Sequence, residues 1–220
     1  TDVGCRIPWR HDLNTWKLMS YLGGACSPCP DGGYSDPVTY RESRFSYRSI
    51  PDTVRRGALS GYFQSERYFK DFAEEIRSLF QPLIAPVRES TAGVHLRMGD
   101  YLQKTDVYHT PDAAFLNEAF KNLSDNIRTL VVFSDSPDLA RKLVEDVPEA
   151  RRFEIVMDEH ETLDALRELT AMQELVLSCS SFSWWGAWLG SQQRVFIQKK
   201  WFTGNIEDEQ DIFCPTWIKL

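Results

Sequence analysis

Short apolar segments alternate with helical segments through the second half of this sequence. Five segments have the length and composition of buried strands, at residues 92–97, 129–134, 153–157, 175–179 and 194–198. Four segments with apolar residues at helical spacing separate them, at residues 111–123, 137–147, 162–173 and 182–190. Alternating strands and helices are joined by parallel crossovers, and continuous apolar strands indicate a sheet covered on both faces. The pattern therefore predicts an α/β fold with a doubly wound, Rossmann-type sheet.

The predicted helices should each bury one apolar face. Three of these faces consist of Leu116, Phe120 and Leu123, of Leu139, Leu143 and Val147, and of Leu163, Leu166 and Leu169. The first part of the chain lacks this alternation. Its one clear helical segment is 65–80, with Phe69, Phe72, Ile76 and Leu79 on one face. Prolines close that segment, so we expect a boundary near Val87 and two regions, a small amino-terminal region at 1–87 and a Rossmann-like domain at 88–220.

The charge balance excludes one class of partner. The chain has a net charge of −7, whereas bulk binding to nucleic acid needs a basic surface. No apolar run approaches the roughly 20 residues that a membrane span needs, and no signal peptide is visible. The sequence begins at Thr1 rather than Met, so we expect either a cytoplasmic protein or a lumenal catalytic domain from which an anchor has been removed. Cys26 and Cys29 fit a redox pair or half a zinc site, but a Pro/Gly-rich surface loop is the favoured interpretation.

Polar side chains gather where the predicted strands end. In open α/β sheets, ligands bind beyond the carboxyl ends of the strands. These ends carry His95, Arg97 and Asp100, then Ser134 and Asp135, then Asp158, then Ser180 and Ser181, and finally Lys199 and Lys200. The sequence therefore predicts a site at this edge of the sheet.

The chemistry of these groups suits a phosphate ester. Arg97 offers a planar fork that binds phosphate oxygens in bidentate fashion. The backbone N–H groups at the start of the helix at 182–190 form a second anion site, with the hydroxyls of Ser181 and Ser183. Asp135 fits as an acceptor at the edge of a purine ring, and His95 fits as a donor to a base or a phosphate.

Each of these residues also has a purely structural interpretation. Arg97 can simply pair with Asp100 or another carboxylate, His95 can be a buried structural histidine, and Asp135 can belong to a helix-capping turn. The string at 180–189, Ser-Ser-Phe-Ser-Trp-Trp-Gly-Ala-Trp-Leu, also has both a functional and a structural interpretation. Its tryptophans can line a ligand pocket or pack the helix, and its place after the fourth strand favours packing that holds the helix start.

Several nucleotide-binding motifs are absent. The sequence has no G-x-G-x-x-G, no P-loop and no G-x-S-x-G elbow, so a dinucleotide dehydrogenase, a P-loop enzyme and an α/β-hydrolase are unsupported. It also has no Asp-x-Asp, which argues against a metal-bridged diphosphate. An arginine and a helix terminus would then have to stabilise a leaving diphosphate.

Four motifs in order resemble those of a known enzyme family. His95-Leu96-Arg97-Met98-Gly99-Asp100-Tyr101 resembles the H-x-R-R-x-D motif of GDP-fucose-dependent fucosyltransferases. The string at 180–189, followed by Lys200-Trp201-Phe202, is similar to a segment of glycosyltransferase family 11, the α-1,2-fucosyltransferases. An upstream segment at 61–69 is similar as well, and Phe133-Ser134-Asp135 matches the start of an F-S-D-D motif. The resemblance covers residues 61–202.

The resemblance implies an inverting, metal-independent enzyme of GT-B-like fold with a reduced amino-terminal half. It needs no cofactor, and it moves L-fucose from GDP-fucose to a hydroxyl of a glycan acceptor, in α-1,2 linkage to galactose. The implied donor-binding residues are His95, Arg97, Ser134, Asp135, Ser180, Ser181 and Ser183, with Arg97 on the diphosphate. Asp100 is favoured over Asp106 as the general base, although Asp100 can instead be a structural partner of Arg97. The acceptor is expected near Tyr62 and Gln64.

Three positions depart from the family pattern. Met98 stands where a second arginine is usual, Ser136 replaces the second Asp of F-S-D-D, and Cys179 stands where Asn is common. Two alternatives therefore stay open. One is a transferase that uses another GDP-sugar, and the other is an inactive module that binds a glycan or a nucleotide.

Overall fold

The computed structural model describes residues 6–7, 27–28, 38–51, 58–204 and 208–220. The chain divides into two compact units. Unit 1 comprises Thr1–Pro82 and Asp208–Cys214, and unit 2 comprises Leu83–Glu207 and Pro215–Leu220. No helix in the described ranges is long and apolar enough to cross a membrane.

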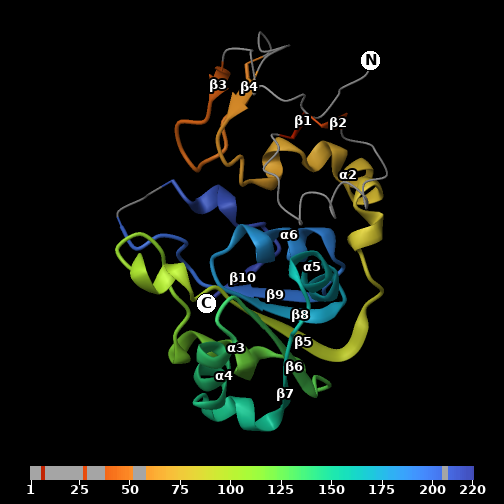
Figure 1. The fold of residues 1–220 in the computed structure, drawn as a ribbon, viewed down its shortest axis with the longest axis vertical. Coiled ribbons are helices and arrows are strands. Elements are labelled where there is room, and N and C mark those ends of the chain that lie inside the picture. Colours follow the sequence, from red (N-terminus) through yellow and green to blue (C-terminus); the bar gives the residue numbers. More distant parts are fainter. Residues whose placement is uncertain (1–5, 8–26, 29–37, 52–57, 205–207) are drawn as a thin grey trace. The chain divides into compact units, whose positions relative to one another are not determined.

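Unit 2 is built on a six-stranded parallel sheet with the strand order β7-β6-β5-β8-β9-β10 (Figure 1). This is the order 3-2-1-4-5-6 of a Rossmann sheet, so the predicted α/β fold with a parallel sheet is confirmed. The strands are β5 (Arg88–Leu96), β6 (Thr129–Ser134), β7 (Glu154–Met157), β8 (Met172–Leu177), β9 (Arg194–Ile197) and β10 (Ile218–Lys219).

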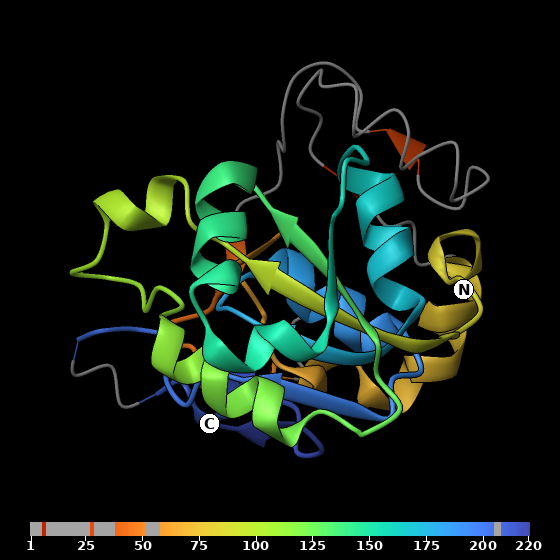
Figure 2. The same ribbon diagram turned by 90° about the horizontal axis from the view of Figure 1, so that it is seen from below.

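Helices cover both faces of this sheet. One pair, α5 (Thr162–Thr170) and α6 (Ser181–Leu189), packs together on one face. The other pair, α3 (Ala113–Asn122) and α4 (Pro137–Glu145), lies on the opposite face (Figures 1 and 2). The central strands are therefore apolar on both sides, with Val94, Val132 and Val176 fully buried.

The helix α6 is held in place by its own aromatic side chains. Trp184 and Trp188 are buried, and Trp184 also packs edge-on against Trp217 with ring centroids 5.7 Å apart. Gly186 lets α6 approach α5 closely, because a Cβ atom there would lie 2.5 Å from Leu169 Cδ2. Packing of the helix is thus the role that the structure gives to Trp184 and Trp188.

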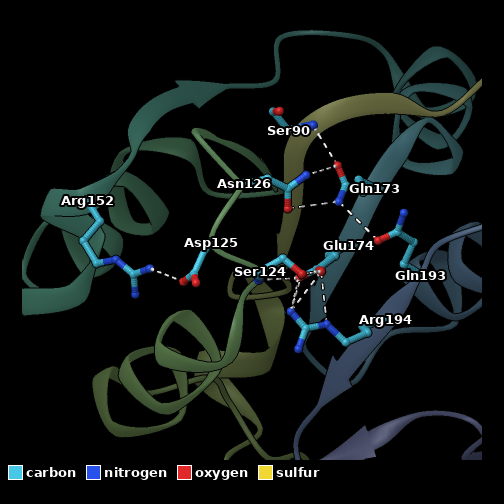
Figure 3. Close-up of polar contacts among 9 residues, drawn as sticks. All are labelled: Ser90, Ser124, Asp125, Asn126, Arg152, Gln173, Glu174, Gln193 and Arg194. Atoms are coloured by element: carbon cyan, nitrogen blue, oxygen red, sulfur yellow. Dashed lines mark hydrogen bonds and ion pairs between the residues drawn. The ribbon is translucent and has the colours of Figure 1, made fainter.

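The strand β8 begins earlier than the sequence predicts. Gln173 and Glu174 were expected near a helix end, but α5 ends at Thr170 and both residues lie fully buried in β8. Their side chains have partners there: the Glu174 carboxylate pairs with the Arg194 guanidinium at 2.9 Å, and Gln173 accepts a hydrogen bond from Ser90 N–H at 2.8 Å (Figure 3). Satisfied polar groups allow a polar sequence to occupy a central strand.

Two further predictions about helices and strands need correction. In α4 the buried residues are Ala140 and Val144, and the predicted Leu139 is exposed, whereas Leu143 packs partly buried against the core and Val147, just after the helix, is fully buried. The strand β10 was not predicted. It has only two exposed residues, and it forms because backbone hydrogen bonds join Leu220 N–H to Ile197 and Lys199 N–H to Leu220.

Unit 1 has less regular structure among its described residues. Two short parallel pairs join β1 (Arg6–Ile7) to β2 (Ser27–Pro28) and β3 (Val38–Arg41) to β4 (Ala58–Ser60). The short helix η6 (Gln210–Ile212) also belongs to unit 1, where Asp211 accepts a hydrogen bond from Tyr47 N–H and pairs with Arg67 at 3.1 Å.

The prediction of one helix over 65–80 is wrong. The segment forms the 3₁₀ helices η1 (Glu66–Tyr68) and η2 (Lys70–Phe72) and then α2 (Ala73–Leu79). Phe69 has φ −145° and ψ 4°, outside the helical region, and this interrupts the helix. Phe72 and Leu79 are exposed, so the expected apolar face is not buried as a whole.

Candidate functional site

The central strands β5 and β8 end side by side, with His95 opposite Leu177. Hydrogen bonds join the segments that follow them. Ser178 N–H donates to the His95 carbonyl at 3.0 Å, and Arg97 N–H donates to Ser178 Oγ at 2.8 Å. The strand order reverses between β5 and β8, and a sheet of this kind binds its ligands at such a point.

A cavity of about 340 Å³ lies at this edge of the sheet, within the size range of small-ligand pockets. It is formed by residues at the ends of β5, β6 and β7 and near the starts of α5 and α6. The structure brings five of the predicted site residues into its lining: His95, Arg97, Ser134, Asp135 and Ser180. We call it the donor cavity below, because the resemblance implies that a nucleotide-sugar donor binds to these residues.

Arg97 lies between two carboxylates. Its guanidinium is 2.7 Å from Asp100 Oδ1 and 3.1 Å from Asp135 Oδ2, and its side chain is partly exposed. Two of its five N–H donors are used in this way, and the others are available to a ligand. Arg97 is therefore an ion-pair partner, as its structural interpretation predicted, and these pairs orient its planar guanidinium before any ligand binds.

Asp135 holds the loop after β5 in place. Its Oδ1 accepts hydrogen bonds from Met98 N–H at 2.9 Å and Gly99 N–H at 3.2 Å. The loop passes so close that a Cβ atom on Gly99 would lie 2.5 Å from Asp135 Oδ2. Met98, at the position where the resemblance has a second arginine, is buried in the core of unit 2. The contact of Asp135 with a purine stays a prediction.

His95 is buried at the base of the donor cavity and is uncharged at neutral pH. Burial is the largest cause that lowers its pKa, to about 4, and the nearby Asp135 only partly opposes it. The imidazole lies 5.4 Å from the ring of Phe182, centroid to centroid. Neutral imidazole donates or accepts one hydrogen bond at each nitrogen but brings no positive charge to a phosphate.

The serines near the start of α6 have different environments. Ser180 lines the donor cavity and does not cap the helix with its side chain, and Ser181 is exposed. Ser183 is fully buried, and its hydroxyl donates to the backbone oxygens of Ser178 and Ser180 at 3.3 and 3.2 Å. The structure therefore does not bring Ser183 into the cavity. In β6, Ser134 Oγ donates to the Leu96 carbonyl at 2.7 Å.

Asp100 pairs with two cations rather than standing free. Its carboxylate contacts Arg97 at 2.7 Å and Lys104 at 3.1 Å, and it is outside the cavity lining. The hydrogen bond from Lys104, followed by the charge of Arg97, lowers the pKa of Asp100. A carboxylate with a lowered pKa is a weaker base. The geometry favours the interpretation of Asp100 as a partner of Arg97, and Asp106 is exposed.

One wall of the cavity was predicted only in part, because the sequence placed Asp158 at this edge but not His160. Asp158 and His160 follow β7 and line the cavity together with Thr162 and Phe182. His160 Nδ1 lies 2.7 Å from Asp158 Oδ1. Asp158 had been recognised as the end of a strand, but nothing in the spacing indicated that a histidine two residues later would turn back to it.

Tyr62 and Gln64, predicted near the acceptor, belong to unit 1. Tyr62 is 73% exposed and lines a cavity of about 410 Å³ within that unit, together with Arg41, Arg44 and Phe45. Gln64 Nε2 is buried without a hydrogen-bond partner in the described part of the chain. Their role with an acceptor stays a prediction.

The cysteines and acidic residues form no metal cluster in the ranges described. No group of three or more His, Cys, Asp or Glu side chains there is arranged to hold an ion. Cys179 and Cys214 are buried and form no disulfide. Cys26 and Cys29 lie outside the described residues, so the redox, zinc and loop interpretations of that pair are unchanged.

Comparison with known proteins agrees with the resemblance. The profile described as "Glycosyl transferase family 11" matches residues 39–220. The chain is 29% identical over 183 residues to "Alpha-1,2-colitosyltransferase" of Escherichia coli, which covers 73% of this chain and 61% of that protein. It is 24% identical over 197 residues to "Putative glycosyltransferase C06E1.7" of Caenorhabditis elegans, which covers 74% of this chain and 53% of that protein. The match thus spans less than two thirds of either relative's length. Because the family profile covers most of the chain and includes the whole described part of unit 2, this protein belongs to glycosyltransferase family 11.

Proposed function

We propose that this protein transfers L-fucose from GDP-fucose to a hydroxyl group of a glycan acceptor, in α-1,2 linkage to galactose. The observation that carries the proposal is the donor cavity at the point where the strand order of the sheet reverses, with Arg97, Ser180 and the start of α6 at its edge. A family 11 glycosyltransferase implies a nucleotide-sugar donor and a glycan acceptor. The cavity volume of about 340 Å³ suits a nucleoside diphosphate.

The proposed reaction proceeds with inversion. The acceptor hydroxyl attacks the anomeric carbon of fucose from the face opposite GDP, the bond from that carbon to the diphosphate breaks, and the hydroxyl proton passes to water. Negative charge then develops on the leaving diphosphate. Arg97 and the backbone N–H groups at the start of α6 stabilise it without a metal ion. A loose, cation-like transition state reduces the need for a strong base, which accords with the ion-paired Asp100.

Within this proposal, Asp100 and Asp135 position the guanidinium of Arg97. Both Asp135 oxygens already hold Arg97 and the loop at Met98 and Gly99, which leaves little capacity to accept hydrogen bonds from a purine. The acceptor would bind to unit 1, where the exposed ring of Tyr62 lies 5.7 Å from that of Phe45 and offers an apolar surface for a sugar. The protein would act in the cytoplasm or, if anchored, in a lumen.

A second donor has specific support. One relative is named as an α-1,2-colitosyltransferase, so GDP-colitose is the leading alternative to GDP-fucose. The roles proposed above for the cavity residues concern the nucleoside diphosphate, which both donors share, and therefore do not discriminate between the two sugars. Transfer assays with both donors and a panel of β-galactosides separate these candidates, and they also separate an enzyme from an inactive binding module.

Replacement of Arg97 tests the diphosphate assignment. Arg97→Ala should abolish transfer and weaken GDP binding at least tenfold, because a charge-assisted contact is lost and the positive charge that offsets Asp100 and Asp135 is removed. Arg97→Lys should retain part of the affinity but not the bidentate geometry. Arg152→Ala removes an arginine that pairs with the surface residue Glu149 and serves as the matched control. Turnover of Arg97→Ala at the wild-type rate would overturn the assignment.

A nucleotide panel tests the donor class and the absence of a metal. Calorimetry with GDP, ADP and UDP in EDTA should show the tightest binding for GDP. Tighter binding of ADP or UDP contradicts the GDP assignment. Transfer that stops in EDTA and returns with a divalent cation contradicts the metal-free mechanism.

A further inference from the structure

His160 is a titratable side chain of the donor cavity that the proposed mechanism does not use. Its ring lies 2.7 Å, Nδ1 to Oδ1, from the carboxylate of Asp158. The His160 side chain is 54% exposed, whereas that of Asp158 is only 5% exposed. The buried carboxylate therefore fixes the orientation of the ring. Because Nδ1 is occupied, Nε2 is the nitrogen left for a ligand.

The charged side chains of the cavity lining do not by themselves neutralise one another, so binding of an anionic ligand requires another cation. Arg97 is positive, Asp135 and Asp158 are carboxylates, and His95 is neutral. With His160 uncharged, the lining thus carries one more negative than positive charge. Arg97 is also shared with Asp100 outside the lining. A diphosphate that enters this cavity would meet net repulsion, and a protonated His160 removes it.

We propose that His160, held by Asp158, is the second cation of the donor site and binds the diphosphate together with Arg97. The inference rests on the proposed function, because it assumes that the ligand is a nucleoside diphosphate. Both residues line one cavity, and the remaining wall near α5 and α6 is uncharged, with Thr162, Ala165, Ser180 and Phe182.

The surroundings of His160 favour its protonated form. The hydrogen bond to Asp158 is the largest cause that raises its pKa above the ordinary 6.5, with Glu168 and Asp164 of α5 contributing in the same direction. Slight burial opposes them. Arg97, His95 and Asp135 are the other titratable or charged groups of the cavity. Protonated His160 is therefore present below its raised pKa and is lost as the pH rises through it, and affinity for a diphosphate should fall in the same direction.

Calorimetry over pH 5.5 to 8.5 tests the proposal, with wild-type protein, His160→Gln and the control His109→Gln. His109 lies outside the donor cavity lining. At each pH the ratio of the Kd values for GDP of variant and wild type is compared, so that the ionisation of the GDP phosphate itself cancels. We expect His160→Gln to bind about tenfold more weakly at pH 5.5 and nearly as well as wild type at pH 8.5. His109→Gln should follow wild type throughout.

Two further ligands locate the contact. Inorganic pyrophosphate should show the same pH-dependent ratio as GDP, and guanosine should bind both proteins equally at every pH. A ratio that does not change with pH overturns the proposal, as does an equal effect on guanosine, which would place His160 on the nucleoside. GDP can bind no better than ADP or UDP while the ratio of Kd values for pyrophosphate still changes with pH. That result contradicts the proposed donor but supports the role of His160 as a diphosphate ligand. If neither pyrophosphate nor GDP binds, both fail.

A second variant tests the contribution of Asp158 separately from that of the His160 ring. Asp158→Asn keeps His160 but removes the negative charge that favours its protonation, so the pH at which GDP affinity falls should move downward. An unchanged midpoint would overturn the role of Asp158. Thermal unfolding of each variant shows that the fold is retained.

Discussion

At the scale of single residues, the donor cavity is organised by contacts between charged groups. The Arg97 guanidinium is shared between Asp100 and Asp135, and Asp135 in turn holds the backbone at Met98 and Gly99. These contacts orient the guanidinium before a ligand binds, which lowers the entropy lost on binding. If the proposed function is correct, binding of a phosphate depends on a small set of paired groups rather than on one free cation.

Gly99 tests this organisation. Gly99→Ala should weaken GDP binding about tenfold, because its Cβ atom would lie 2.5 Å from Asp135 Oδ2 and displace the carboxylate that holds Arg97. Thermal stability should change little, since Gly99 is not in the core. Gly204→Ala is the matched control, because no atom lies within 4 Å of the added Cβ there. Wild-type GDP affinity in Gly99→Ala would contradict the positioning role of Asp135.

His95 and His160 should titrate far apart. Burial lowers the pKa of His95 to about 4, whereas Asp158 raises that of His160 above 6.5. The ring signals of the two histidines in NMR spectra recorded from pH 3.5 to 8.5 check this. Since unfolded His95 takes up a proton near pH 6.5 and folded His95 does not until about pH 4, stability falls as the pH falls through that window, by about 3 kcal/mol at most. A His95 midpoint near 6.5 would disprove its burial as a neutral group.

At the scale of secondary-structure elements, α6 links packing to the site. Its first residues border the donor cavity, and its later residues, Trp184 and Trp188, are buried in unit 2. The close contact of Gly186 with Leu169 sets the distance between α6 and α5. Both helices begin at the carboxyl edge of the sheet, so this packing also sets the width of the cavity wall.

Substitution of Gly186 should therefore destabilise the protein. Gly186→Ala would place a Cβ atom 2.5 Å from Leu169 Cδ2, and such overpacking costs about 1 to 3 kcal/mol, partly offset by the better helix propensity of alanine. Chemical denaturation measures the change in unfolding free energy. Combined with Leu169→Ala, which makes room, Gly186→Ala should cost less than the two single changes added together. Strict additivity of the two changes would argue against direct contact.

At the scale of the whole of unit 2, the two ends of the sheet have different tasks. The carboxyl ends carry the donor cavity. Toward the amino ends, Glu174 joins β8 to Arg194 of β9 and to Ser124, which precedes β6, and Gln173 contacts Asn126 and Gln193 (Figure 3). Glu174 is fully buried, and these partners compensate for the loss of water around its carboxylate.

A change at Glu174 should lower stability and leave binding intact. Glu174→Leu leaves Arg194 without its carboxylate and should cost about 3 kcal/mol, whereas Glu174→Leu combined with Arg194→Leu should recover most of that loss. Thermal unfolding measures the stability, and GDP calorimetry well below the transition measures the binding. A large loss of GDP affinity in the folded variant would show that the two ends of the sheet are coupled.

The sequence by itself determined the α/β class, the alternation of five strands with four helices and most of the donor cavity. Strand ends in a parallel sheet meet at one edge, so His95, Arg97, Asp135 and Ser180 could be grouped without coordinates. The family followed from short motifs around the same residues.

Other features depend on contacts between residues far apart in the chain, which local pattern does not encode. Gln173 and Glu174 are in a strand because Ser90, Ser124 and Arg194 satisfy them there. Ser183 is in the core although its neighbour Ser181 is exposed, because the helical turn of α6 points it at the backbone of Ser178. His160 joins the cavity through its contact with Asp158, and side-chain partners of this kind become visible only when the chain has folded.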